Sequence, residues 1–448
     1  MPKSTVIYYS LNRKMKQIII LLFLSILTAN AQETVKFSNT EEILSYATQH
    51  SIALKSGNAQ MALAKFQTYY AKINSFNPRA NVGYGITDNF QLPVNFLPAE
   101  VFGGVAGTFK EAKLGQQYVQ NLSVTPQIDL INHAAWAKLQ SAQTNEKLTE
   151  INNVFIRKTL SESVVGVYFS IVSNQQQLEL LIKTHQNADS VLTIIENKLN
   201  QGIIRSQDVN NAQVNKLMIQ DKIQQVQNTI EQQINLLKSL CETTTETNFV
   251  ITHKTNLTTQ ENGLVSLNTL KTQQAEYQIK YAQNELKISQ LNYYPTLSLM
   301  GSLAFQENSN NHFFDGNARW IPISYLGLRL NYAIPDANKN AQNKVAKTNL
   351  EIAQFNGQKQ QIQQQFEQKQ LQLEYQKAID NEQLTQKILN LKRDTYQKNL
   401  NLFNQNIYPA ENLLFSFTDE LNATLAHVLA KVNIEFQQAK ININNTLK

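Results

Sequence analysis

The sequence predicts a mainly α-helical protein with a β-barrel part, built from a duplicated helix–strand–strand–helix repeat. Long Gln/Asn/Lys-rich segments place apolar residues three or four positions apart, as in amphipathic helices. Two Gly/Pro/aromatic-rich segments alternate with period two, as in strands. Two landmarks also recur at a single spacing. We expect one repeat at 32–240, a second at 269–448, and a linker at 241–268 between them.

Residues 1–31 are predicted to be a secretory signal peptide. Lys14 and Lys16 precede an apolar run at 18–27, and residues 29–31 form an Ala-x-Ala cleavage pattern. Met15 is the more natural start, so residues 1–14 are interpreted as an over-extended start. The alternative is a membrane anchor, but the apolar run is shorter than the roughly 20 residues that a transmembrane helix needs.

The charge balance and the cysteine count exclude two classes. Removing residues 1–31 takes away four basic residues and no acidic one, so the formal net charge falls from +6 to +2. A nucleic-acid-binding protein, which needs a clustered basic surface, therefore loses its main support. Cys241 is the only cysteine, which excludes an intramolecular disulfide framework.

Two regions carry the apolar stripe of long helices packed as coiled coils. A helix of roughly 50 residues would reach about 75 Å, which exceeds an ordinary globular core, so we expect an elongated bundle. The stripes comprise Leu178, Leu181, Ile182, Val191, Leu192, Ile195, Leu199, Ile219, Ile223, Val226, Ile230, Ile234 and Leu237, then Leu384, Ile388, Leu391, Leu414, Phe417, Leu421, Leu425, Val428, Val432 and Phe436.

Each repeat also contains a predicted pair of strands, at about 78–131 and 295–335. Alternation of apolar and polar residues over about ten positions is typical of transmembrane barrel strands, although a soluble hairpin with one wet face looks similar. Aromatic residues near the predicted strand ends are candidates for a girdle at the membrane interface. They are Tyr84, Tyr293, Tyr294, Phe305, Trp320 and Tyr325.

A shared spacing indicates an internal duplication. Asn132 after the first strand pair corresponds to Asp336 after the second, an offset of 204 residues. Gly202 at the first helix break corresponds to Asn406 at the second, again with an offset of 204.

The two strand pairs differ in their connection. Pro78 and Pro295, which open them, lie 217 residues apart, so the first connection is longer by about 13 residues. The extra residues fall in a Gly/Pro/Phe-rich loop at about 90–116, which we place outside the cell because barrels carry their length variation there. Four strands cannot close a barrel, whereas three copies would supply 12.

The helix breaks carry a family resemblance. Residues 199–213 contain Gly202, a short mixed stretch, Asp208-Val209 and Ala212, and the segment at 403–417 is a degenerate copy with Asn406 and Asn412. Together with Pro295 before a strand and the segment 333–336, this order is similar to the TolC family of outer-membrane channels, over essentially the whole mature chain.

The resemblance implies a homotrimer in the outer membrane of a Gram-negative bacterium. Its four strands per chain would form a 12-stranded transmembrane β-barrel in contact with outer-membrane lipid, and its helices a periplasmic tunnel. The function implied is a passive exit duct for tripartite efflux or type I secretion, with a periplasmic adaptor (membrane fusion protein) and an inner-membrane pump of RND, ABC or MFS type as partners. Candidate residues at the periplasmic aperture are Gly202, Arg205, Asp208, Asn406, Tyr408 and Asn412.

The breaks are also readable as helix termini. Gly202 can adopt the left-handed conformation that ends a helix, Ser206 or Asp208 can cap the next one, and Pro409 fits a first turn. A purely capping role for Asp208 is as well supported as an aperture role. Because Asn412 replaces an acid common in the family, we expect only weak cation selectivity.

Two other classes of protein fit the sequence less well. An enzyme is disfavoured because the six histidines are scattered and no nucleophile, phosphate-loop or metal-ligand motif is recognisable, so we expect no cofactor and no metal. A periplasmic coiled-coil adaptor or structural protein is the alternative, since adaptors also combine a helical hairpin with β-structure.

Overall fold

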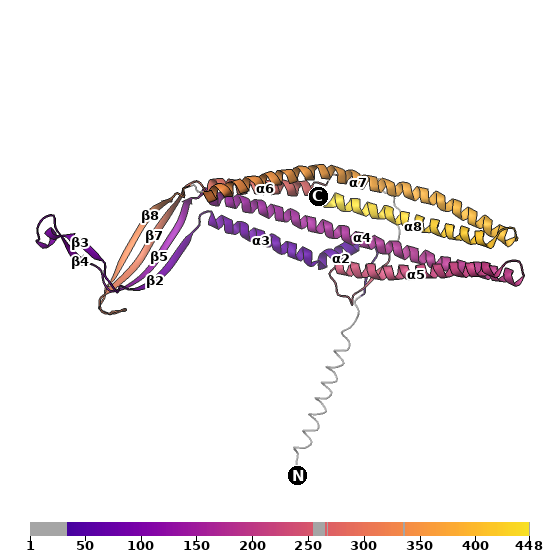
Figure 1. The fold of residues 1–448 in the computed structure, drawn as a ribbon, viewed down its shortest axis with the longest axis horizontal. Coiled ribbons are helices and arrows are strands. Elements are labelled where there is room, and N and C mark those ends of the chain that lie inside the picture. The colour runs from indigo at the N-terminus through magenta and orange to yellow at the C-terminus, as the bar shows by residue number, and fades with distance from the viewer. Residues whose placement is uncertain (1–33, 254–264, 267, 335–336, 448) are drawn as a thin grey trace, which may run out of the picture. The chain divides into compact units, whose positions relative to one another are not determined.

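A computed structural model describes residues 34–253, 265–266, 268–334 and 337–447. The predicted signal peptide and Asp336 lie outside these residues. The helices, shown in Figure 1, are α2 (Thr40–His50), α3 (Ile52–Asn74), α4 (His133–Asn200), α5 (Ser206–Leu240), α6 (Leu270–Leu291), α7 (Ala337–Asn404), α8 (Ala410–Thr446) and the 3-10 turn η1 (Ala99–Phe102). The strands are β1 (Thr34–Phe37), β2 (Arg79–Asp88), β3 (Val94–Pro98), β4 (Phe109–Lys113), β5 (Tyr118–Ile131), β6 (Asn248–Ile251), β7 (Thr296–Ser309) and β8 (Trp320–Asn331).

The chain divides into two compact units that do not follow the predicted repeats. Unit 1 contains residues up to 57, 154–270 and 363 onward, and unit 2 contains 58–153 and 271–362. Each unit therefore takes residues from both halves of the chain, and the long helices α4 and α7 contribute to both units.

The helices α4 and α7 match each other in length and position. Each has 68 residues, and both their first and their last residues lie 204 positions apart. Neither contains a proline, which would remove a backbone donor and clash with the preceding turn. The first residues of α5 and α8 are also 204 apart. These helices are longer than the roughly 50 residues that the apolar stripes indicated.

Two hydrophobic clusters hold unit 1 together. One surrounds the parallel pair β1–β6 and includes Phe37, Tyr168, Leu237 and Cys241. The other packs the ends of α4, α5, α7 and α8 through residues such as Ile195, Phe403 and Leu413. The short strands β1 and β6, four residues each, were not predicted, because so few residues carry no readable alternation.

Unit 2 contains a four-stranded antiparallel sheet with strand order β2-β5-β7-β8. The register places Val82 opposite Val124 and Val124 opposite Leu303, so the middle of one face is apolar. Ser123 and its sequence neighbours at every second position lie on the other face. The four strands lie where the sequence predicted them. The edge strands β2 and β8 are exposed along almost their whole length.

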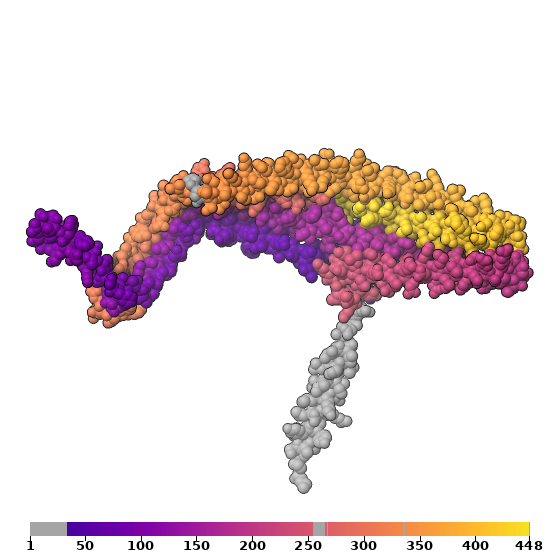
Figure 2. Space-filling view, in the orientation of Figure 1, coloured from indigo at the N-terminus to yellow at the C-terminus, as the bar shows by residue number. Residues whose placement is uncertain are grey.

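The connection between β2 and β5 contains structure that the sequence did not predict. The segment expected to be a loop, 90–116, includes a small antiparallel hairpin of β3 and β4 with η1 at its turn. This hairpin stands clear of the four-stranded sheet (Figure 2). Its strands have five residues each, too few for the alternation rule to separate them from a loop.

Candidate functional site at the helix tips

The first candidate tip is the turn between α4 and α5 in unit 1. Gly202 has a φ of +74°, the left-handed conformation expected of a residue that ends a helix. Its N–H donates to the Leu199 carbonyl oxygen at 2.8 Å, and the Ile203 N–H donates to the Lys198 carbonyl oxygen at 3.0 Å. These bonds pair carbonyl groups that the end of α4 would otherwise leave free.

The second tip, between α7 and α8, repeats this geometry without a glycine. Asn406 has a φ of +63°, and its N–H donates to the Phe403 carbonyl oxygen at 3.0 Å. The Ile407 N–H donates to the Leu402 carbonyl oxygen, also at 3.0 Å. Asparagine is among the few non-glycine residues that visit the left-handed region routinely, so this turn keeps its shape.

The helices that leave the tips begin with different caps. The N-cap of α5 is Arg205, in an extended conformation, and Ser206 is already the first helical residue. Asp208 accepts a hydrogen bond from the Arg205 N–H at 3.1 Å. The predicted capping role of Asp208 is confirmed, but that of Ser206 is wrong because the extended backbone ends one residue earlier. Pro409 is the N-cap of α8, where its missing N–H costs nothing.

Lys198 connects the two tips. Its side chain lies near the end of α4 and only 8% of the residue is exposed. The ammonium group donates to the Asn406 side-chain oxygen and to the Asn404 carbonyl oxygen, the latter at 3.4 Å. It also lies 5.0 Å from the centroid of the Phe403 ring, a cation–π distance. A buried ammonium needs such partners, because an unpaired buried charge is strongly disfavoured.

Around this contact the tips form a depression of about 440 Å³. Four of the six candidate aperture residues line it, namely Arg205, Asp208, Asn406 and Tyr408, whereas Gly202 and Asn412 do not and are exposed. The remaining lining residues are Lys198, Ile203, Ile204, Phe403, Ile407, Pro409, Ala410 and Glu411. Its charged side chains are two basic and two acidic, so it carries no formal net charge.

Sequence reasoning missed Lys198 although a signal was present. The stripe of α4 was predicted to end at Leu199, but the buried residues from 191 onward are Val191, Leu192, Ile195 and Lys198, with Leu199 only partly buried. A single lysine at the end of an apolar stripe indicates a buried charge that requires a partner. Its partner, Asn406, lies 208 residues away in the sequence, which the local pattern does not reveal.

The six candidate aromatic residues lie in unit 2 at two kinds of position. Tyr293 and Tyr294 precede β7, and Trp320 is the first residue of β8, so these three lie at strand ends. Tyr84, Phe305 and Tyr325 lie inside their strands, which corrects the prediction for them. For Phe305 and Tyr325 the reason is strand length, because β7 and β8 have 14 and 12 residues and extend beyond the ten-residue segments assumed.

Two further observations concern the described residues as a whole. Within them, no helix has both the length and the apolar character that a membrane crossing requires. Nor do these residues contain a group of three or more His, Cys, Asp or Glu side chains placed to hold a metal ion.

Comparison with known proteins identifies the fold. No protein-family model matches the sequence, and the search of curated proteins finds no significant match. Solved structures do match. The outer membrane protein VceC of Vibrio cholerae is similar with a TM-score of 0.75 and 16% identity, covering 90% of this chain and 95% of VceC. The CmeC outer membrane channel of Campylobacter jejuni is similar with a TM-score of 0.69 and 15% identity, covering 90% of this chain and 85% of CmeC.

A third match is the open state of the MtrE outer membrane channel of Neisseria gonorrhoeae. Its TM-score is 0.67 and its identity 12%, covering 90% of this chain and 88% of MtrE. The chain therefore has the fold of TolC-like outer-membrane channels, which confirms the resemblance at the level of the fold.

Proposed function

We propose that this chain belongs to the TolC family and is one third of an outer-membrane channel in a Gram-negative bacterium. Three copies form a 12-stranded barrel in the membrane and a helical tunnel in the periplasm. The channel serves as the passive exit duct of a tripartite efflux or type I secretion system. The observation that carries this proposal is a four-stranded sheet with two open edges, on a chain that has the fold of outer-membrane channels.

The open edges support the trimer. Within the described residues, β2 and β8 each pair with one neighbour, and their side chains are exposed on both faces. A bilayer contains no water to satisfy free backbone groups, so strand edges in it must be paired. Pairing β8 of one copy with β2 of the next satisfies both edges, and three copies reach a strand number that encloses a channel.

A groove between α5 and α8 in unit 1 supports docking of a periplasmic adaptor. It measures about 380 Å³ and is lined by apolar residues that stay exposed, including Val214, Met218 and Phe415. These residues are 54%, 59% and 70% exposed, and a bound partner would remove this apolar surface from water. The adaptor would connect the channel to an inner-membrane pump of RND, ABC or MFS type, which supplies the energy.

The depression at the tips is the proposed aperture. Lys198 holds the second tip against α4 through Asn406, and the exposed Arg205 and half-buried Asp208 present opposite charges beside it. Because two acidic and two basic side chains line the depression, we expect only weak cation selectivity. The substitution Asp208→Asn should weaken that selectivity further, which recordings in planar bilayers would measure. A strong selectivity that survives Asp208→Asn would contradict an aperture role for Asp208.

Purification and reconstitution test the channel itself. The purified mature chain should behave as a trimer in detergent, migrate as a trimer on an unheated gel, and give discrete conductance steps in planar bilayers. A heated sample, which migrates as a monomer, is the control for assembly. A monomer that fractionates with the periplasm and gives no conductance would overturn the proposal and favour the adaptor alternative.

A further inference from the structure

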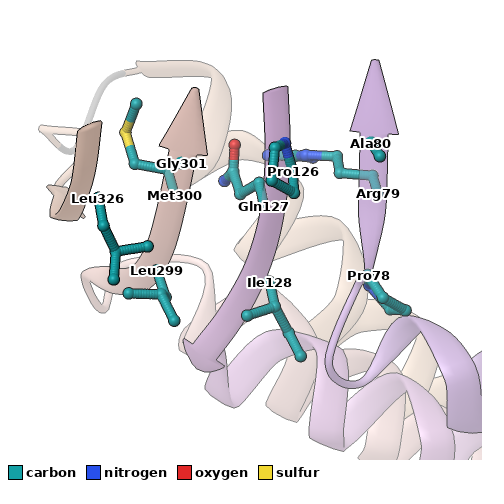
Figure 3. A pocket seen from close by; sticks show the side chains of 10 residues that line it. All are labelled: Pro78, Arg79, Ala80, Pro126, Gln127, Ile128, Leu299, Met300, Gly301 and Leu326. Carbon is teal, nitrogen blue, oxygen red and sulfur yellow. The ribbon is translucent and has the colours of Figure 1, made fainter. Parts of the chain in front are cut away.

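The apolar face of the four-stranded sheet contains a hollow of about 480 Å³ (Figure 3). The strand register explains it. Ala80 lies opposite Pro126, and Gly301 lies opposite Leu326. The Pro126 ring lies 3.5 Å from the place where a Gly301 Cβ would be, so these small residues occupy adjacent positions across the middle of the sheet. Ala80, Pro126 and Gly301 present only a methyl group, a flat ring and a hydrogen atom, whereas the residues around them on this face carry large side chains.

Larger apolar residues form the walls of the hollow. Ile128 and Leu299, opposite each other in the register, lie on one side, and Leu326 closes one end. The surrounding face is apolar and exposed: Val82 is 72% and Leu303 57% exposed. Arg79, Gln127 and Met300 also line the hollow, but strand alternation directs their side chains to the opposite face.

This lining selects its occupant by chemistry. The side chains that reach the hollow from the apolar face offer no hydrogen-bonding group, so water placed there would lack the two to four polar partners it requires. A polypeptide segment would bring N–H and C=O groups into a site that cannot pair them, at a cost in free energy. A hydrocarbon chain has no such groups, and the hollow falls within the size range of ligand sites.

We propose that this hollow binds one acyl chain of a phospholipid on each copy of the chain. The inference rests on the proposed function, because only a sheet that lies in a bilayer meets acyl chains. It adds a lipid site at a defined place on a surface that would otherwise contact lipid without preference, and it assigns Gly301 as the residue whose missing side chain creates the site.

The test fills the hollow from Gly301. A Cβ at this position would lie 3.5 Å from the Pro126 Cγ and the Tyr325 carbonyl oxygen and 3.7 Å from the Leu326 Cδ1, all ordinary contacts, so Gly301→Ala should fold normally. Gly301→Leu adds the bulk that occupies the hollow. Gly327→Leu is the matched control: residue 327 belongs to the same sheet, lies opposite Met300 on the other face, and its Cβ would meet nothing within 4 Å.

The measurement is the phospholipid retained by each protein. Trimers are extracted with mild detergent from vesicles of palmitoyl-oleoyl-phosphatidylethanolamine and analysed by native mass spectrometry. Wild type and Gly327→Leu should each retain one phospholipid per chain, Gly301→Leu at least tenfold less, and Gly301→Ala an intermediate amount. Equal retention by wild type and Gly301→Leu overturns the inference.

Conductance in planar bilayers, recorded on the same preparations, separates the two levels of the proposal. Wild type and all three variants should form channels of the same conductance. If all four proteins form such channels but wild type retains no phospholipid, the lipid site is wrong and the proposed channel function is retained. If wild type forms no channels, the proposed function fails, and the lipid site that depends on it fails too.

Discussion

At the scale of single residues, the contact of Lys198 with Asn406 decides how the two tips are held together. The lysine lies in the hydrophobic end of the helix bundle, where a charge is tolerated because an amide oxygen, a carbonyl oxygen and an aromatic ring surround it. Asn406 serves two purposes: its backbone forms the left-handed turn and its side chain accepts the lysine.

Lys198→Met should loosen the tips without unfolding the protein. Methionine keeps the packing on Phe403, and Asn406 is exposed enough for water to replace the lysine, so the protein should still fold. Loss of a charge-assisted hydrogen bond, worth about 1.5–3 kcal/mol, should speed amide exchange at Ile203 and Ile407 roughly tenfold or more. Hydrogen exchange with mass spectrometry measures this.

A matched control comes from the same bundle. Lys216→Met removes an ion pair with the exposed Asp189 and should leave exchange at both tips unchanged. If the two variants affect the tips equally, Lys198 has no special connecting role.

Cys241 should be inert in the folded protein. It is fully buried in the cluster around β1 and β6, and burial raises the pKa of its thiol to about 12. Because the thiolate is the reactive form, and a raised pKa keeps the thiol neutral, a thiol reagent at pH 8 should not label the native protein. In denaturant one thiol per chain should react, and Cys241→Ser should show none. Rapid labelling of the native protein would contradict this burial.

At the scale of elements, replacing a glycine should have opposite effects on stability in the turn after α4 and in the interior of α4. Gly202 has a left-handed backbone and Gly166 a helical one, and a Cβ at either would meet nothing within 4 Å, so only backbone conformation distinguishes them. Gly202→Ala should lower stability by about 1–2 kcal/mol. Gly166→Ala should raise it by about 1 kcal/mol. Thermal denaturation followed by circular dichroism compares the two, and shifts of the same sign would refute the assignment of the turn.

The sequence was most informative where elements are long. The helices and the four long strands repeat their apolar pattern often enough to be recognised, and the breaks at Gly202 and Asn406 follow from helix-terminus chemistry. The strands β1, β3, β4 and β6 have four or five residues, which is too few for a readable apolar alternation, so they were not predicted. The contact of Lys198 with Asn406 could not be predicted in this way, because Asn406 lies in the turn after α7, 208 residues away in the sequence.

At the scale of the whole molecule, the edge of β8 offers a test of assembly. Pro322 in β8 has no N–H, and prolines in strands occur where the N–H would face away from a partner. Alternation then directs the N–H of Ser324 to the same open edge. If copies pair through this edge as proposed, Ser324→Pro should remove a donor to the neighbouring copy and lower the temperature at which the proposed trimer dissociates on a gel.

Ser324→Ala serves as the control, because it removes the same hydroxyl but keeps the backbone donor. Its trimer should dissociate at the wild-type temperature. A Ser324→Pro trimer as stable as that of Ser324→Ala would mean that this edge is not a contact between copies.

The two tips share a backbone but not a chemistry. Position 402, the counterpart of Lys198, is a leucine, and the counterpart of Asn406 is Gly202, which has no side chain to receive a hydrogen bond. The lysine of this contact therefore comes from the first half of the chain and the asparagine from the second. No equivalent contact with the two halves exchanged can form. In a ring of three copies, six tips would be fastened by three such contacts. Neighbouring tips in such a ring would then meet in two ways: the two tips of one copy are joined by the lysine, and the tips of adjacent copies are not. The contacts between copies are where the ring would open first.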